Sequence, residues 1–114
     1  MARSLNIALA QTTVSTAPKK NLQTARHWIR RASDQGADLV VFPEMFMARP
    51  RQDIALAQIA EPLDGPFTAK LSALAVEHTI AVICGVWDLF LWRPRANLPC
   101  RVLRAEPVIC PTVL

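Results

Sequence analysis

The 114-residue sequence predicts an α/β fold that begins β-α-β-α-β and ends in an irregular tail. Three observations predict this fold. Residues 39–42 and 80–87 are continuous apolar runs, which are typical of parallel strands with both faces covered. A helical pattern of apolar positions precedes each run. This alternation stops after Asp88, and four of the nine prolines fall in the remaining residues.

The first strand is expected at residues 5–11, where apolar side chains alternate before a Thr-Thr turn. Ser15 or Thr16 can cap the following helix, and Pro18 suits its first turn because the N–H that proline lacks has no helical partner there. Gly36 is expected to end the helix in a left-handed conformation. The apolar positions of this helix share one face: Leu22, Ala25, Ile29 and Ala32.

Pro43 should end the second strand, because proline cannot donate a hydrogen bond to a neighbouring strand. Residues 45–64 form a long connection with a short helix expected near residues 54–59, and Asp64-Gly65-Pro66 opens the second long helix. With strand 80–87 next, we expect right-handed crossovers between parallel strands. The face of the second helix that should pack on the sheet comprises Phe67, Leu71, Leu74, Ala75 and His78.

The charge pattern excludes a uniformly basic nucleic-acid binder. The net charge is +4, but residues 1–88 carry nine basic and eight acidic side chains, and residues 89–114 carry four Arg and one Glu. No apolar run is long enough to cross a bilayer, and the first residues lack the pattern of a secretory signal. An odd number of cysteines argues against a disulfide framework. We therefore expect a soluble, cytoplasmic protein with no nucleic-acid or membrane partner.

Glu44 is the first candidate for chemistry, because it follows the carboxyl end of a buried strand, where open α/β sheets bind ligands. Met45 and Phe46 should partly desolvate its carboxylate, which would favour a general base. The alternative is a solvated loop glutamate. Met45 and Phe46 themselves could line the mouth of a substrate pocket or pack against the sheet as loop core, and the sequence does not separate these two interpretations.

The string GADLVVFPEMF, residues 36–46, resembles the first signature block of the nitrilase superfamily. Its surroundings are similar too: the strand ending in Ala10-Gln11, the Asn21-Leu22 pair and the strand over residues 80–85. The resemblance covers roughly residues 5–88 and is specific because the block lies in the right strand–helix–strand order. It implies the opening part of an α-β-β-α sandwich, for which both sheet faces are covered only when the second half is present.

The resemblance also implies a reaction and a substrate class. Family members cleave amide-type C–N bonds or nitriles with a Glu–Lys–Cys constellation, in which the Glu takes the thiol proton and the Cys attacks carbon. The Lys stabilises the negative charge that develops on the substrate. Glu44 matches the family's general base, and no cofactor or metal is implied.

The other two positions of this constellation match nothing here. The family's Lys follows the third strand in a Tyr-Arg-Lys-like context, and this chain has no Tyr and no Lys after Lys70. Lys19, Lys20 and Lys70 are interpreted as solvated helix residues. Cys84 should be a buried strand residue, and Cys100 and Cys110 lack both the nucleophile's context and a zinc-ligand spacing.

The remaining chemically capable side chains carry ordinary interpretations. His27 and His78 are expected to be helix residues without catalytic partners, and the tryptophans are expected to pack. Arginines in the tail lack the aromatic interleaving of a nucleic-acid surface. No glycine-rich phosphate loop follows the first strand, which argues against a nucleotide binder.

Residues 1–88 are therefore interpreted as the N-terminal part of a carbon–nitrogen hydrolase domain, and residues 89–114 as a Pro/Arg-rich tail. The change of composition near Asp88 suggests a change of reading frame, with natural divergence as the alternative. Two functions stay open. One is a hydrolase fragment that is inactive alone. The other is a non-catalytic α/β fragment that binds a partner, either another copy or a full-length relative, through its open sheet.

Overall fold

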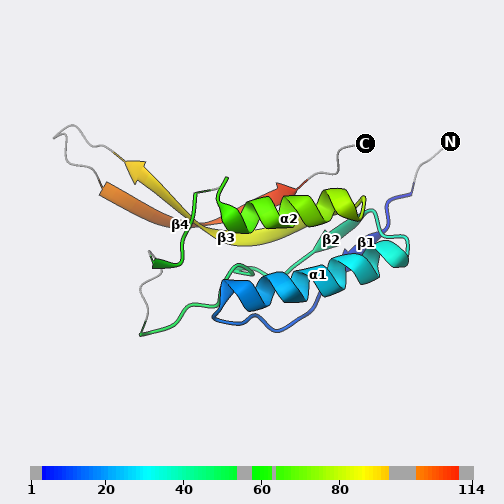
Figure 1. Ribbon diagram of the computed structural model, residues 1–114, viewed down its shortest axis with the longest axis horizontal. Coiled ribbons are helices and arrows are strands. Elements are labelled where there is room, and N and C mark those ends of the chain that lie inside the picture. Colours follow the sequence, from blue (N-terminus) through cyan, green and yellow to red (C-terminus); the bar gives the residue numbers. More distant parts are fainter. Residues whose placement is uncertain (1–3, 54–57, 63, 93–99, 111–114) are drawn as a thin grey trace.

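The computed structural model of the chain describes residues 4–53, 58–62, 64–92 and 100–110. The elements follow one another in a simple order: β1 (Ile7–Leu9), α1 (Pro18–Asp34), β2 (Leu39–Val41), α2 (Pro66–Glu77), β3 (Ala81–Trp92) and β4 (Cys100–Cys110) (Figure 1). The predicted β-α-β-α-β order is confirmed.

A four-stranded sheet in the order β1-β2-β3-β4 forms the centre of the fold. The first three strands are parallel, and Val40 of β2 lies between Ala8 of β1 and Val82 of β3. β3 and β4 pair in the antiparallel direction. The three parallel strands and two helices agree with the α/β fold that the sequence predicts.

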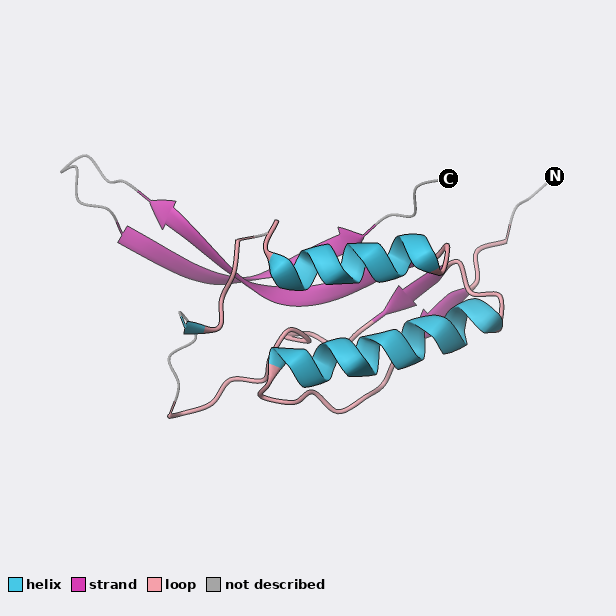
Figure 2. Ribbon diagram, in the orientation of Figure 1, coloured by secondary structure: helices cyan, strands magenta, loops and turns pink. Residues whose placement is uncertain are grey.

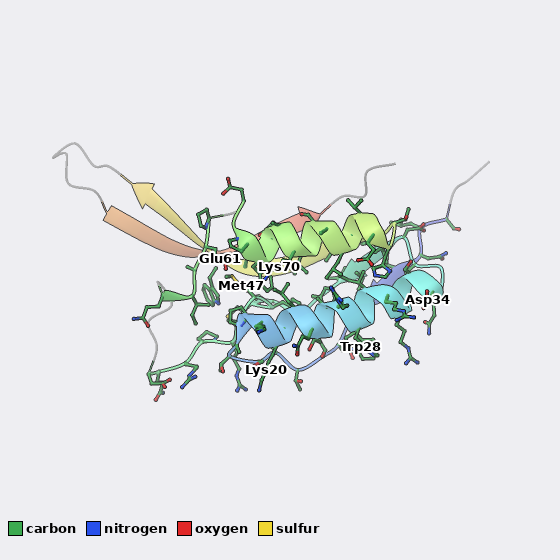
Figure 3. All side chains as sticks on the ribbon, in the orientation of Figure 1. Lys20, Trp28, Asp34, Met47, Glu61 and Lys70 are labelled. Atoms are coloured by element: carbon green, nitrogen blue, oxygen red, sulfur yellow. The ribbon has the colours of Figure 1, made fainter. Side chains whose placement is uncertain are left out.

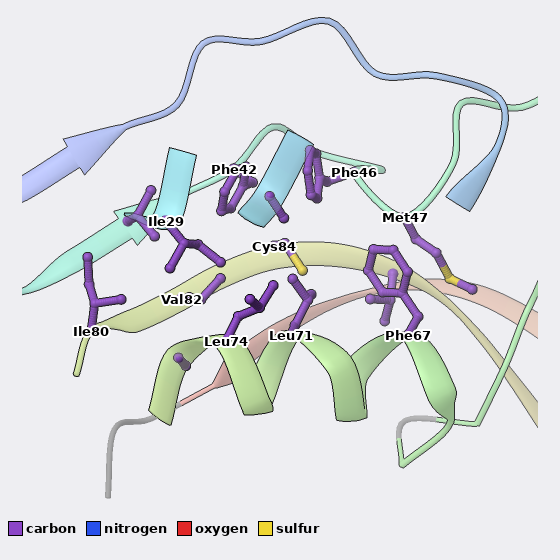
Figure 4. Close-up of a cluster of buried hydrophobic side chains, with 14 of the residues drawn as sticks. Ile29, Phe42, Phe46, Met47, Phe67, Leu71, Leu74, Ile80, Val82 and Cys84 are labelled. Carbon is purple, nitrogen blue, oxygen red and sulfur yellow. The ribbon is translucent and has the colours of Figure 1, made fainter. Parts of the chain in front are cut away.

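Both helices lie on the same face of the sheet, side by side (Figure 2). This follows from the connection rule, because two successive right-handed crossovers that move in one direction place their helices on one side. Every second residue of β3 is buried against the helices, from Val82 through Cys84 to Val86. Figure 4 shows Val82 and Cys84 facing apolar residues of both helices, among them Ile29, Leu71 and Leu74.

The helix ends agree with their sequence signals except at the first cap. Pro18 is the first residue of α1, but the N-cap is Ala17, so the predicted cap at Ser15 or Thr16 is wrong. Ser15 instead accepts a hydrogen bond from the Ala17 N–H at 3.1 Å and shapes the turn before the helix. Gly36 has φ +84°, as its predicted left-handed conformation requires.

The N-terminus of α2 is capped from outside the helix. Gly65 is the N-cap residue and supplies no side chain, so Oε1 of Glu61 accepts the hydrogen bond of the Phe67 N–H at 2.7 Å. Figure 3 shows Glu61 at this end of α2. The predicted apolar face is confirmed for Phe67, Leu71, Leu74 and Ala75, and His78 is the partly buried C-cap residue.

The tail is not irregular where the structure describes it, so that prediction is wrong for residues 89–92 and 100–110. β3 continues to Trp92 and pairs along its length with β4. The prolines in this part of the sequence interrupt the apolar pattern, so the sequence did not indicate these strands. Pro107 pairs with Gly85, and β4 tolerates it because an edge strand needs only half of its hydrogen-bonding groups. Of the short helix expected near residues 54–59, residues 54–57 lie outside the described part.

The face of the sheet opposite the helices carries exposed apolar side chains. Ile7 is 52% exposed and Leu9 is 69% exposed, while Ala8 between them packs on the core. Leu39 and Ile83 on the neighbouring strands are partly exposed on the same face. In a sheet-on-sheet sandwich, a second sheet packs on an apolar face of this kind.

Candidate active site

Glu44 lies three residues beyond the end of β2, in a turn formed by residues 44–47, hereafter the Glu44 turn. The predicted position at the carboxyl end of a buried strand is therefore observed. The predicted desolvation is not, because Glu44 is exposed. The chain turns Phe46 and Met47 into the core, at 0% and 1% exposure, and this rotation leaves the carboxylate on the outside.

Backbone groups fasten the Glu44 turn to β3. β2 pairs with β3 only as far as Ile83, so the next stretch of β3 has a free edge. The Phe42 N–H donates to the Ile83 carbonyl at 2.9 Å, and the Met47 N–H donates to the Gly85 carbonyl at 3.1 Å. These two backbone hydrogen bonds lie on either side of Glu44 and resemble the hydrogen bonds between β2 and β3. They hold the Glu44 turn against β3.

The same edge of β3 also holds the connection to α2. The Glu61 N–H donates to the Trp87 carbonyl at 3.1 Å, and the indole Nε1 of Trp87 donates to the Ala48 carbonyl at 2.9 Å. The loop after β2 and the segment before α2 therefore meet at Trp87, which confirms a packing role for this side chain.

Gly85 allows the Glu44 turn to lie close to β3. A Cβ built on Gly85 would lie 2.8 Å from the Met45 nitrogen, which no real side chain tolerates without movement. Met45 itself has a left-handed φ of +57°, a conformation that costs energy for a residue with a side chain. This backbone conformation belongs to the turn that presents Glu44.

Met45 and Phe46 occupy different environments. Phe46 is fully buried and stacks on Phe42 with ring centroids 4.4 Å apart. For Phe46 the structure therefore favours loop core over a substrate-facing position, because no part of the ring is accessible. Met45 is partly buried beside Gly85.

Asn21 is a residue of this site whose role the sequence did not reveal. It is 1% exposed on α1, and its carboxamide contacts Ser15 and the carbonyl of Met47, the last residue of the Glu44 turn. The sequence signal for this role is a polar residue on the apolar face of α1. A polar side chain on such a face becomes buried and then needs specific hydrogen-bond partners.

The lysine and cysteine candidates lie on helices and strands, and Glu44 lies in the turn after β2. Lys20 and Lys70 project from the two helices, as Figure 3 shows, and Lys19 is likewise exposed. Cys84 is 2% exposed on the helix side of β3, as predicted for a structural cysteine. Cys100 and Cys110 are the end residues of β4. Among the described residues, no group of three His, Cys, Asp or Glu side chains could hold a metal ion.

The two histidines lie on or at the end of helices, as predicted: His27 is within α1, and His78 is the C-cap residue of α2. His27 contacts Trp28 edge to face at 4.7 Å on α1, and Arg31 lies 5.7 Å from the Trp28 ring. His78 accepts a hydrogen bond at its backbone carbonyl from the Ser33 hydroxyl at 2.7 Å, which ties the ends of α1 and α2 together.

Comparison with known proteins identifies the family. The model of the carbon-nitrogen hydrolase family matches residues 6–90, three quarters of the chain and the whole region that builds the Glu44 turn. The chain belongs to the carbon–nitrogen hydrolase family. A hydrolase of Mycobacterium tuberculosis is 42% identical over 83 residues, which are 73% of this chain and 29% of that protein. The omega-amidase NIT2 of Homo sapiens is 37% identical over 82 residues, 72% of this chain and 29% of its own length.

Solved carbon–nitrogen hydrolases share the fold. The NitN amidase from Nesterenkonia sp. AN1 superposes with a TM-score of 0.67 at 27% identity, over 91% of this chain and 39% of the amidase. Mutants of the same amidase, described as a member of the nitrilase superfamily, have been solved with butyramide and with acrylamide added to the active-site cysteine. This chain spans less than a third of the length of the curated relatives named above.

Within the described residues, no helix is both long and apolar enough to cross a membrane.

Proposed function

We propose that Glu44 is the general base of a thiol-dependent carbon–nitrogen hydrolase, of which this chain represents the N-terminal portion. In that reaction the carboxylate takes the proton of a cysteine thiol, and the thiolate attacks the carbonyl or nitrile carbon. With an amide, the tetrahedral intermediate expels ammonia or an amine and leaves a thioester, which water hydrolyses to the acid and the free thiol. A lysine ammonium stabilises the charge that develops on the substrate.

The observation that carries this proposal is the Glu44 turn itself. Backbone hydrogen bonds from Phe42 and Met47 to β3 hold the chain on either side of Glu44, at the carboxyl end of a parallel strand. They give Glu44 the defined backbone position that a general base needs. Its exposure in this chain agrees with a site whose other residues come from outside residues 1–88.

The relatives favour amides as substrates. One is named an omega-amidase, and the amidase from Nesterenkonia binds butyramide, a primary amide. We therefore propose primary amides of small carboxylic acids as the first class to test, with nitriles as the second.

We expect no hydrolysis by this chain alone. Lys70 projects from α2 on the helix side of the molecule, and Cys84 is buried on that same side of the sheet. Neither residue matches the lysine or the cysteine position that the family resemblance implies. Turnover of a primary amide by the purified chain, if lost on Glu44→Gln, would contradict this part of the proposal.

A chimera tests the role of Glu44 directly. Residues 5–88 would replace the matching segment of a related amidase, which supplies the lysine and cysteine. The chimera should hydrolyse butyramide, and Glu44→Gln should lower kcat/KM by about 10²–10⁴-fold, the usual contribution of a general base. Glu61→Gln is the matched control, because Glu61 caps α2 and should leave kcat/KM within a few-fold. Equal activity of the Glu44→Gln chimera would refute the proposal.

The second candidate function is partner binding through the open apolar face. Ile7 and Leu9 expose most of their side chains on a face that none of the described helices covers. A contiguous exposed apolar surface of this kind is typical of an interaction site. Co-purification of the chain with an intact relative would support this function, and a strictly monomeric chain that captures no relative would argue against it.

A further inference from the structure

We infer that Asn21 is a positioning residue for Glu44: its carboxamide holds the far end of the Glu44 turn and so fixes where the carboxylate lies. This inference rests on the proposed function of Glu44 as a general base. It concerns a residue on α1 that is remote from Glu44 in sequence and that acts through the backbone of Met47, without touching substrate.

Asn21 uses its amide oxygen and both amide protons in hydrogen bonds. Oδ1 accepts a hydrogen bond from the Ser15 N–H at 2.8 Å, and Nδ2 donates to the Ser15 carbonyl at 2.9 Å and to the Met47 carbonyl at 3.0 Å. The side chain is 1% exposed, so water does not compete for these bonds. Among the described residues, no buried side-chain nitrogen or oxygen lacks a hydrogen-bond partner.

Met47 is consequently held from two directions. Its N–H donates to the Gly85 carbonyl of β3 at 3.1 Å, and its carbonyl accepts from Asn21 of α1 at 3.0 Å. Its side chain is 1% exposed. Figure 4 shows it in the cluster of buried apolar side chains. Sheet, helix and core thus fix the same residue. Glu44 lies three positions earlier in one tight turn, so a displacement of Met47 moves the carboxylate.

The chemistry of this contact requires an amide. Asparagine supplies an acceptor for the Ser15 N–H and two donors for the carbonyls of Ser15 and Met47. Aspartate would keep the acceptor but place a negative carboxylate against two carbonyl oxygens, and alanine would leave all three backbone groups without this partner. A role limited to the loop before α1 would need only the contacts with Ser15.

Solution NMR on the full chain separates these roles. We would compare the wild type with Asn21→Ala and Asn21→Asp, and use Gln23→Ala as the matched control, because Gln23 is an exposed residue of the same helix. The readouts are the hydrogen exchange of the Met47 amide and the coupling constant of the Met45 amide, which reports its φ angle. Amides of Val40 and Val82 in the sheet report global unfolding.

Both Asn21 variants should raise Met47 exchange by about tenfold, the value of one hydrogen bond, and should change the Met45 coupling, while the sheet amides keep their exchange rates. Gln23→Ala should change none of these quantities. Wild-type exchange of Met47 and an unchanged Met45 coupling in both Asn21 variants would overturn the inference.

If both variants unfold, the wild-type chain still decides the question. A coupling across the hydrogen bond between Nδ2 of Asn21 and the carbonyl carbon of Met47 should be detectable, and its absence would overturn the inference. These results do not depend on catalysis. Full activity of a Glu44→Gln chimera would remove the proposed function but leave the NMR results unchanged, so the two failures are distinguishable.

Discussion

Met45 lies against Gly85 so closely that a Cβ at position 85 would come within 2.8 Å of the Met45 nitrogen. The Met45 nitrogen is a backbone atom, so it cannot rotate away from a new Cβ as a side-chain atom can. Gly85 is therefore required by the close approach of the Glu44 turn to β3.

Gly85→Ala should displace the Glu44 turn. We expect a loss of about 1–3 kcal/mol in the free energy of unfolding, as for other overpacked sites, and changed amide shifts at Met45 and Met47. Urea unfolding and amide spectra measure the two effects. Gly36→Ala is the control: it forces a side chain to adopt φ +84° in open space, so it should cost about 1–2 kcal/mol without moving Met45. Unchanged Met45 and Met47 shifts in Gly85→Ala would contradict the packing argument.

Phe46→Ala should cost about 3–5 kcal/mol, because it removes a fully buried ring stacked on Phe42. A loss of that size would unfold much of a small chain of marginal stability. Met45→Ala removes a partly buried side chain and should cost clearly less. Urea unfolding followed by circular dichroism makes the comparison. Equal stability of the two variants would mean that Phe46 is not core and would restore its interpretation as a pocket residue.

Glu61→Ala should destabilise α2 by about 1 kcal/mol, because the Phe67 N–H loses the carboxylate that caps it. Glu61→Gln keeps an oxygen acceptor at the same length and should recover most of this loss, apart from the attraction between the carboxylate and the positive end of the helix. Thermal unfolding measures both variants. If alanine and glutamine proved equally destabilising, charge and not hydrogen bonding would be the source of the effect.

Leu9→Lys should reduce self-association of the chain. Leu9 is 69% exposed on the open apolar face, and a charge there opposes burial against any second apolar layer. Val76→Lys is matched to it, because Val76 is 49% exposed but lies on α2, and this change should leave association as it is. Sedimentation velocity over a range of concentrations would measure the difference. Equal association of both variants would place the contact elsewhere.

Asp53 should titrate below its ordinary range. The hydrogen bond from the Arg51 guanidinium, with Nε to Oδ1 at 2.8 Å, lowers the pKa of the Asp53 carboxyl, and the same pair raises the pKa of Arg51. A lowered pKa stabilises the folded state above the ordinary Asp pKa, and that contribution is lost as the pH falls through the lowered value. Because both groups are exposed, the change in melting temperature should be negligible.

Carboxyl NMR titration checks this prediction. In Arg51→Gln the Asp53 midpoint should rise toward the ordinary value, because the hydrogen bond that lowers it is lost. An Asp53 midpoint that does not respond to Arg51→Gln would show that the pair is not formed in solution.

The sequence by itself determined the order of strands and helices, the left-handed Gly36 and the position of Glu44 at a strand end. These features depend on neighbours within a few residues: the spacing of apolar side chains, a proline that stops a strand and a glycine that allows positive φ. The block around Glu44 also indicated the family, which the match over residues 6–90 confirms.

Only the tertiary structure decided how Glu44 is held and how the tail pairs. Asn21 meets Met47 across 26 positions, and Gly85 meets Met45 across a longer separation, so no local pattern records either contact. β4 is a strand because β3 offers it an edge, despite Pro107. Glu44 is exposed, contrary to expectation, because core packing of Phe46 and Met47 sets the direction of the turn. Long-range packing chooses among conformations that local propensity leaves nearly equal in energy.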